Sequence, residues 1–340
     1  MNKVILKKGR ENLAVTVFVP YDCTNNCSFC TSKNMYKTCS KDKESILKVL
    51  KIMNKLDITD IVITGGEPFA NLNYLQEIID VIEDKNIFIN TTLPIMYPDA
   101  ENDILNFIKK NKKITGINVS RHKNSFEEDT ITFNSNIFTD ELISKIDKPV
   151  KINCVIQDGL SIPILLDRWN KVKNCRLSLR ADYTKITTAN LKTLNDDVIS
   201  NLLLYCSYIS HGGCDVCFDV SFAYNNLNIS YHKGLEFSSI QIGNTILIND
   251  IIIKPNGASY YDWDDKEIPN FLENLIKYLG KKTNTNITSR PNITSTITNS
   301  SCFKNSCGGS SVCGMSNIHS KETLCNTKSC CGNSYSFCGR

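Results

Sequence analysis

Two kinds of hydrophobic spacing alternate along residues 14–180. Short runs rich in β-branched residues indicate strands, and the segments between them, whose apolar residues recur every three or four positions, indicate amphipathic helices. The predicted strands are Ala14–Val19, Asp60–Thr64, Ile87–Thr92, Gly116–Arg121, Lys151–Gln157 and Arg176–Arg180. The predicted helices are Lys43–Leu56, Leu72–Glu83, Ala100–Lys110, Thr139–Ile146 and Ile162–Val172.

Six strand-helix units in a row predict an α/β fold. Strands joined through helices run parallel with right-handed crossovers, so the pattern is typical of a barrel or a doubly wound sheet. In both architectures the reactive loops lie at the carboxyl ends of the strands. Functional residues are therefore expected directly after the predicted strands.

The pattern changes after about residue 185. A helix is predicted at Asp196–Ser207, followed by a small antiparallel sheet over Val216–Ile229, Ser238–Leu247 and Asp250–Asp262 and by a closing helix at Pro269–Leu279. Turn signals such as Asn225-Asn226 separate the strands. This stretch is expected to form a small extension of the α/β core.

Residues 281–340 differ in composition from the rest of the chain. Ser, Thr and Asn account for 28 of these 60 residues, and seven are Cys. Such a segment buries little apolar surface, so we expect disorder unless metal or thioether bonds hold it. The predicted domains are thus 1–185, the core; 186–280, the β-rich extension; and 281–340, a basic, Ser/Thr/Asn/Cys-rich tail.

The composition, 41% hydrophobic over 340 residues, suits a globular protein. The first 15 residues lack the apolar run of a signal peptide, and no stretch reaches the roughly 18 apolar residues of a membrane helix. We therefore expect a cytoplasmic protein without membrane contact, in which 16 cysteines favour metal or redox chemistry over disulfides. The basic tail lacks a stripe of cations with interleaved aromatics, so nucleic acid is not an expected partner.

Three cysteines follow the first predicted strand at short spacings. Cys23, Cys27 and Cys30 are separated by three and by two residues. This spacing lets three thiolates reach three corners of a cubane iron-sulfur cluster. The next cysteine, Cys39, lies nine residues further on, so one iron would stay open for an external ligand. A zinc knuckle without a local fourth ligand, or reduced structural cysteines, are the alternatives.

A second motif ends the next strand, where the sequence reads Thr64-Gly65-Gly66-Glu67-Pro68. Paired glycines let the backbone approach a ligand closely, Pro68 stiffens the turn, and Glu67 supplies an acceptor or a charge. In a barrel the loops after strands one and two are neighbours on one rim. The open iron and this turn would therefore face the same cavity.

Together the two motifs resemble the radical SAM superfamily, whose members have a Cys-x3-Cys-x2-Cys loop after strand one and a Gly-Gly-Glu-Pro motif after strand two. The resemblance covers roughly residues 13–180. It implies a partial (β/α)6 barrel of the TIM-like kind in which Cys23, Cys27 and Cys30 bind a 4Fe-4S cluster. It further implies that S-adenosylmethionine (SAM) chelates the fourth iron and that the backbone of Gly65–Pro68 meets its amino group.

Other residues on the same rim are weaker candidates for SAM or substrate contacts. Phe29 occupies the place where the superfamily usually has an aromatic beside adenine, and Ser120 is a candidate for the ribose or carboxylate. Core-packing or capping roles are open alternatives for the remaining candidates. These are Asn90, Thr91, Thr92, Arg121, Asn153 and Gln157.

Within the superfamily the chain resembles both the molybdenum-cofactor GTP cyclases and the SPASM-twitch peptide maturases. Its length, its cysteine loop near residue 25 and the segment Pro149–Asn153 are similar to the cyclases. Those enzymes hold triphosphate with a basic residue on strand one and an Arg after Gly-Gly-Glu-Pro. Here strand one reads Val15-Thr16-Val17-Phe18-Val19 and Asn71 replaces the Arg, so GTP cyclisation is not the favoured reaction.

The remaining cysteines leave several interpretations open. Cys214 and Cys217 chelate a metal only if a turn intervenes, because residues three apart on a strand point to opposite faces. The tail cysteines do not follow the twin-cluster SPASM spacing, but they could bind a divergent auxiliary cluster or zinc, act as a fused peptide substrate, or remain unstructured. They are Cys302, Cys307, Cys313, Cys325, Cys330, Cys331 and Cys338.

We therefore expect a radical SAM enzyme that forms a 5′-deoxyadenosyl radical and takes hydrogen from a substrate. A peptide undergoing maturation, or another biosynthetic intermediate, is the expected substrate, and a flavodoxin- or ferredoxin-type protein the expected reductant. No protein acid, base or nucleophile is needed for the radical step. A GTP cyclase relative and a non-catalytic iron-sulfur or electron-transfer protein are the alternatives.

Overall fold

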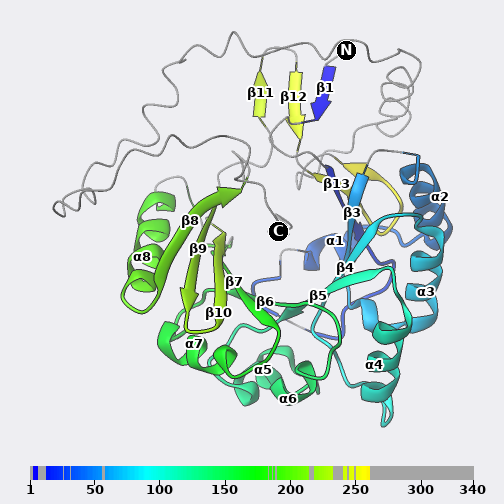
Figure 1. Ribbon diagram of the computed structural model, residues 1–340. Coiled ribbons are helices and arrows are strands. Elements are labelled where there is room, and N and C mark those ends of the chain that lie inside the picture. Colours follow the sequence, from blue (N-terminus) through cyan, green and yellow to red (C-terminus); the bar gives the residue numbers. More distant parts are fainter. Residues whose placement is uncertain are drawn as a thin grey trace. The chain divides into compact units, whose positions relative to one another are not determined.

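The computed structural model describes most of the first 260 residues of the chain (Figure 1). The described residues are 3–6, 13–25, 27–30, 32–55, 58–182, 184–185, 187, 190–213, 218–232, 240–242, 245–248 and 250–260. The helix predicted at Pro269–Leu279, the pair Cys214 and Cys217, and the whole 281–340 tail lie outside them.

The core consists of strands that alternate with helices. Its strands are β2 (Leu13–Phe18), β3 (Ile58–Thr64), β4 (Asn86–Thr91), β5 (Ile114–Ser120), β6 (Val150–Val155) and β7 (Cys175–Arg180). The segments between them form α1 (Lys33–Thr38), α2 (Lys43–Met53), the 3₁₀ turn η1 (Pro68–Ala70), α3 (Leu72–Val81), α4 (Ala100–Lys110), α5 (Phe126–Phe133), α6 (Asp140–Ile143) and α7 (Ile162–Asn170).

These six strands are hydrogen-bonded in chain order, and each pair is parallel. All six predicted strands are confirmed, and each lies within two or three residues of its predicted bounds. Figure 1 shows the strands in a curved row with α2, α3, α4, α5, α6 and α7 along its outer side. This is the mostly parallel α/β architecture that the strand-helix alternation predicts.

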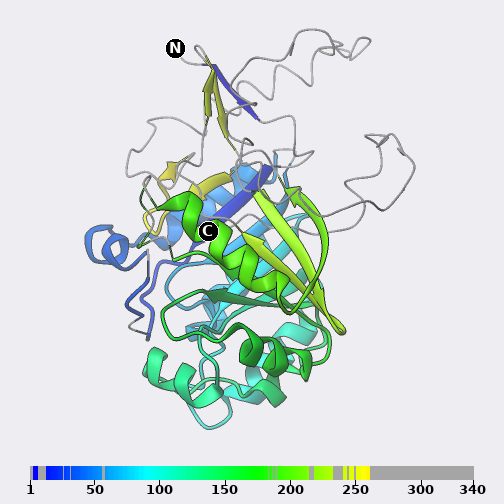
Figure 2. The same ribbon diagram turned by 90° about the vertical axis from the view of Figure 1, so that its left-hand side faces the viewer.

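Later segments extend the sheet at both edges. They are the strands β8 (Ser207–Gly213), β9 (Phe218–Tyr224), β10 (Leu227–His232), β13 (Asp250–Ile253) and β14 (Ser259–Tyr260), which follow the helix α8 (Leu191–Leu203). The full order of the eleven strands is β14-β13-β2-β3-β4-β5-β6-β7-β10-β9-β8. In Figure 2 the lime-green strands β8–β10 lie alongside the green strand β7. The strands β1 (Lys3–Leu6), β11 (Ile240–Ile242) and β12 (Thr245–Ile248) pair in a second sheet.

The later elements differ in detail from the sequence prediction. The helix α8 begins and ends several residues before the predicted Asp196–Ser207, because β8 begins at Ser207. The turn signal at Asn225-Asn226, inside the predicted segment Val216–Ile229, is confirmed, because Asn225, with a φ of +50°, makes a tight turn between the antiparallel strands β9 and β10. The strand β10 then pairs in parallel with β7, and β13 pairs in parallel with β2.

The two faces of the main sheet have different chemistry. One face carries buried aliphatic residues, such as Ile61 and Ile63 on β3 and Ile87 and Ile89 on β4, and it packs under the helices. Side chains alternate along a strand, so the intervening positions line the opposite, inner face. There Asn118 donates to Asn90 over 2.7 Å. The inner face therefore combines polar side chains such as these with a small buried apolar cluster of Val62 and Phe88.

Candidate cofactor site

The three-cysteine loop between β2 and α1 is fastened to the neighbouring strand ends. The Tyr21 hydroxyl donates to the Pro68 carbonyl over 2.8 Å, which ties this loop to the glycine turn. Asn25 Nδ2 donates to Thr92 Oγ1 over 3.0 Å, and Ser135 Oγ donates to Asn25 Oδ1 over 2.7 Å. These bonds join segments up to 110 residues apart, so the loop is held at the carboxyl ends of β3 and β4.

The three thiols share one environment at the surface of this rim. Cys23 and Cys30 are exposed and Cys27 is partly buried. Desolvation, with the nearby Cys23 and Cys30 thiols, raises the pKa of Cys27 to about 12, and desolvation also raises the pKa of Cys23 to about 11. Three soft thiol ligands that lie close enough to affect one another's pKa are suited to an iron-sulfur cluster. The cluster would bind with release of the thiol protons. Within the described part of the chain, no group of three potential ligand side chains is already close enough to hold a metal ion.

The glycine turn after β3 requires residues without a side chain. Gly65 and Gly66 have φ values of +72° and +45°, in the left-handed region that favours glycine. A Cβ on Gly66 would lie 2.0 Å from the Tyr21 carbonyl oxygen, and a Cβ on Gly65 would lie 2.1 Å from the Phe18 ring. The two glycines therefore let the turn pack directly against the cysteine loop.

Glu67 is buried behind the turn, and both of its carboxylate oxygens accept hydrogen bonds from other groups of the protein. One oxygen accepts from Thr91 Oγ1 over 2.6 Å and from the Phe69 backbone N–H over 3.2 Å. The other accepts from the backbone N–H and the hydroxyl of Thr92, over 2.8 and 2.7 Å. Burial raises the pKa of Glu67, and these four donors oppose that rise. The carboxylate thus fixes the turn, and the backbone of Gly65–Pro68 is the part of the motif that can meet a ligand.

His122, which the sequence analysis did not single out, packs against the aromatic residue of the cysteine loop. The centroid of its ring lies 4.5 Å from the centroid of the Phe29 ring, in an edge-to-face arrangement, and 5.6 Å from the centroid of the Phe133 ring. The Val155 backbone N–H donates to Nδ1 over 3.0 Å, so the neutral ring carries its proton on Nε2. Burial, with Arg121 and Lys123 nearby, lowers the pKa of His122 to about 3. The ring is therefore a neutral support for Phe29.

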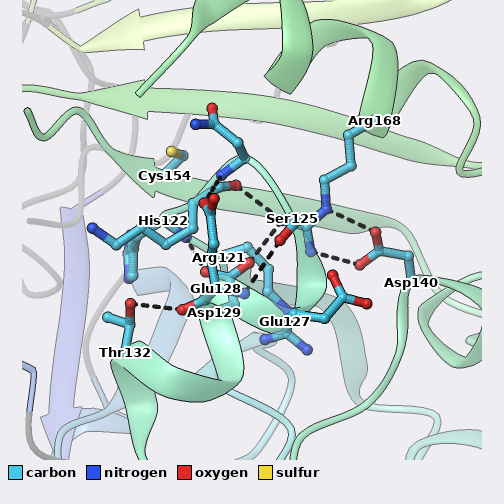
Figure 3. Close-up of polar contacts among 12 residues, drawn as sticks. Arg121, His122, Ser125, Glu127, Glu128, Asp129, Thr132, Asp140, Cys154 and Arg168 are labelled. Carbon is cyan, nitrogen blue, oxygen red and sulfur yellow. Dashed lines mark hydrogen bonds and ion pairs between the residues drawn. The ribbon is translucent and has the colours of Figure 1, made fainter. Parts of the chain in front are cut away.

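A buried ion-pair network positions the segment that carries His122 (Figure 3). Asp129 on α5 accepts from the His122 backbone N–H over 2.7 Å and from Arg168 Nη1 over 2.8 Å. Arg168, on α7, also donates through Nε and Nη2 to both carboxylate oxygens of Asp140, over 2.7 and 2.8 Å. Three helices are thereby clamped to the loop after β5, behind the cysteine loop.

The other predicted site residues divide between the two faces of the sheet. Asn90, Ser120 and Asn153 lie on the inner face, and Ser120 and Asn153 are cross-strand neighbours on β5 and β6. Thr91 instead bonds Glu67, and the Arg121 side chain is fully buried on the helix-covered face, donating to the Phe138 carbonyl over 2.7 Å. Thr91 and Arg121 therefore support the rim from behind rather than line the inner face.

Sequence reasoning also missed two tyrosines that fasten the site. The hydroxyls of Tyr21 and Tyr36 donate to backbone carbonyls of Pro68 and Val19, the latter over 2.7 Å. Both flank the cysteine motif, but nothing in their spacing shows a distant backbone partner. Their contacts can be found only once the chain is folded.

The comparisons with known proteins agree with this geometry. Residues 17–153 match the family model described as the radical SAM superfamily. A protein named "Probable GTP 3',8-cyclase" from Thermoplasma volcanium is 27% identical over 168 residues, 47% of this chain and 50% of its own. A GTP 3',8-cyclase from Staphylococcus haemolyticus is 25% identical over 215 residues, 54% of this chain and 61% of its own. The matched region thus spans half to three fifths of these relatives.

Solved structures share the fold at low sequence identity. SuiB from Streptococcus suis bound to S-adenosylmethionine has a TM-score of 0.50 at 16% identity, covering 77% of this chain and 63% of that one. SuiB bound to the precursor peptide SuiA has a TM-score of 0.52 at 17% identity, covering 77% and 64%. In the described residues, no helix is long and apolar enough to cross a membrane.

Proposed function

Residues 17–153 of this chain are a radical SAM domain, and from this premise we propose that Cys23, Cys27 and Cys30 hold a 4Fe-4S cluster whose open iron binds SAM. Once bound and reduced, this pair of cofactors supplies reductive cleavage of SAM to methionine and a 5′-deoxyadenosyl radical that takes hydrogen from a substrate. The observation that carries the proposal is the fastening of the three-thiol loop to the glycine turn through Tyr21 and Pro68.

The protein's own groups would bind, orient and shield. Gly65 and Gly66 let the turn pack against Phe18 and the Tyr21 carbonyl, and Glu67 keeps the turn rigid from behind, so that its backbone would meet the methionine amino group. Phe29, supported by the neutral ring of His122, would lie beside adenine. The inner-face side chains Ser120 and Asn153 are the proposed contacts for the polar part of SAM.

We propose a peptide as the substrate, modified during its maturation. The fold is shared with SuiB, one structure of which is bound to a precursor peptide. The curated relatives are GTP cyclases, which makes GTP the second candidate, but the aliphatic strand Val15–Val19 and Asn71 lack the basic residues expected for a triphosphate. A flavodoxin- or ferredoxin-type protein would supply the electron.

The proposed function is tested by anaerobic incubation of the iron-loaded protein with SAM and dithionite. We expect 5′-deoxyadenosine and methionine in equal amounts. Iron-loaded protein that forms no 5′-deoxyadenosine would instead be an iron-sulfur binding or electron-transfer protein. Addition of candidate precursor peptides or of GTP then identifies the substrate class, because the true substrate is consumed as 5′-deoxyadenosine accumulates.

A further inference from the structure

Exposed apolar side chains gather where the helix α8 ends and the strand β8 begins. Among the described residues nine large hydrophobic side chains are exposed, and five of these lie between positions 203 and 209. These five, here called the border patch, are Leu203 (46% exposed), Leu204 (72%), Tyr205 (46%), Tyr208 (48%) and Ile209 (53%). Single exposed apolar residues are ordinary on a protein surface, whereas a group of them is typical of an interaction site.

The local backbone holds the border patch outward. Leu202, in the last turn of α8, and Cys206, just before β8, are both buried, so the three residues between them face away from the core. The Cys206 backbone N–H donates to the Leu202 carbonyl over 2.8 Å, which closes this connection. The Tyr208 ring packs edge to face on the buried Phe222 ring, with centroids 6.3 Å apart, and its hydroxyl is hydrogen-bonded to His211 Nδ1. The patch is therefore ordered before any partner binds.

This border of the sheet carries no charge. Figure 1 shows α8 and β8 at one side of the sheet, and β8 is the last strand in the order of eleven. Proteins commonly guard such edge strands with lysine or other charged residues. Residues 202–213 contain no Asp, Glu, Lys or Arg, although 22% of the chain is charged. Two copies of this surface could therefore meet without repulsion between like charges.

The border patch lies at the opposite end of the sheet from the cofactor site. Ser207 pairs with Ala223 beside the β9–β10 turn, and β10 begins there at Leu227. Because β10 runs parallel to β7, this is the amino end of the parallel strands, whereas the cysteine loop and the glycine turn follow their carboxyl ends. A substrate that reacts at the cofactor site therefore does not need this surface.

An extended peptide and the tail are both poor partners for the border patch. Tyr208 and Ser210 pair with consecutive residues of β9, so Ile209 is an extra residue that bulges from the ladder. A bulge distorts the edge on which a further strand would pair. The 281–340 tail, in which 28 of 60 residues are Ser, Thr or Asn, offers little apolar surface in return. The patch is suited instead to side-chain packing against an equally apolar surface.

We propose that the border patch is the interface of a homodimer, in which it packs against the border patch of a second copy of this chain about a two-fold axis. A surface that meets itself in this way is isologous, so each exposed side chain is covered in both copies at once. Burial of apolar surface drives the association, and the ordered patch loses little freedom. This inference goes beyond the proposed function and does not depend on it.

The test is analytical ultracentrifugation of the full-length, anaerobically reconstituted protein over a concentration series. We expect the mass to rise from the 38.3 kDa of one chain toward twice that value. Leu204→Glu and Ile209→Lys should each weaken the association at least about tenfold, because one substitution places two charges in the apolar interface. The control Ile131→Lys, on α5 and 78% exposed, should leave the association unchanged. Circular dichroism checks that each variant is folded.

Photo-crosslinking locates the interface without a disruptive substitution. With p-benzoylphenylalanine in place of Ile209, irradiation should join two chains, with the crosslink inside residues 203–209 of the second copy. The same group in place of Ile131 should give no such product.

Three results would overturn the inference. These are a wild-type protein that stays monomeric throughout the concentration series, equal association of Ile209→Lys and Ile131→Lys, and a crosslink from position 209 to the tail of the same chain. The last result would assign the border patch to the tail. None of these measurements involves SAM cleavage, so each of these failures would leave the proposed function intact.

Discussion

At the scale of single residues, the turn after β3 depends on the arrangement of donors around Glu67. Each of its two oxygens accepts one backbone N–H and one threonine hydroxyl. From the sequence, Glu67 is expected to offer an acceptor or a charge to a ligand. The structure shows that the acceptor role is internal, which could not be predicted because Thr91 and Thr92 belong to the next strand.

Glu67→Gln should destabilise the protein by about 2 kcal/mol, because in either orientation the amide NH₂ must face a backbone N–H. Chemical denaturation measures this loss in the free energy of unfolding. The matched control is Glu77→Gln on α3, which removes only an exposed pair with Lys43 and should cost less than about 1 kcal/mol. Equal losses in the two variants would contradict the assigned role of Glu67.

Gly66→Ala should disrupt the site, because the new Cβ would meet the Tyr21 carbonyl oxygen at 2.0 Å. Gly159 is a suitable control, since it also has a positive φ, +80°, but no atom lies within 4 Å of its Cβ position. Gly159→Ala should therefore lower the free energy of unfolding by only about 1 kcal/mol, the cost of holding alanine at a positive φ. SAM affinity, measured by equilibrium dialysis, should fall only in Gly66→Ala, and an unchanged affinity there would argue against close packing of the turn and the cysteine loop.

At the scale of elements, the sequence predicts helices well where their apolar stripe is strong. The helix α4 has its predicted bounds, Ala100–Lys110, and the stripe of α2 is buried at Ile46, Val49, Leu50 and Met53. The helix α5, Phe126–Phe133, was not predicted because it has no such stripe and buries only Asp129 and Phe133. Polar contacts place it instead: Ser125 caps its start and Asp129 pairs with Arg168.

Arg168→Leu should destabilise the protein by about 3–5 kcal/mol, because the fully buried Asp129 and the partly buried Asp140 would both lose their ion pair with Arg168. Thermal and chemical denaturation measure this loss. Lys145→Leu, which removes an exposed pair with Glu141, should have little effect. If the two substitutions lowered the stability equally, the ion-pair network would not be what holds α5, α6 and α7 together.

At the scale of the whole molecule, the order and direction of the core strands could be read from the sequence. Six strand-helix units dictate parallel neighbours, and this outcome is confirmed. The partners of the later strands could not be read, because β10 joins β7 and β13 joins β2 across long stretches of chain.

Metal analysis of the full-length protein tests whether the cysteine-rich tail binds a metal. About four irons per chain correspond to the core cluster alone, and about eight would require a second cluster among the tail cysteines. Zinc in place of additional iron would identify the tail as a zinc site. Mass spectrometry after turnover with SAM tests self-modification, which predicts a changed tail mass.

The central claim is that three thiolates on the loop after β2 leave one iron open to SAM. The most direct measurement compares Cys27→Ala with Cys39→Ala, after anaerobic reconstitution, in the assay for 5′-deoxyadenosine. The account predicts that Cys39→Ala keeps the iron chromophore and cleaves SAM, whereas Cys27→Ala loses both properties. A Cys27→Ala protein that retained the chromophore and still released 5′-deoxyadenosine would contradict it.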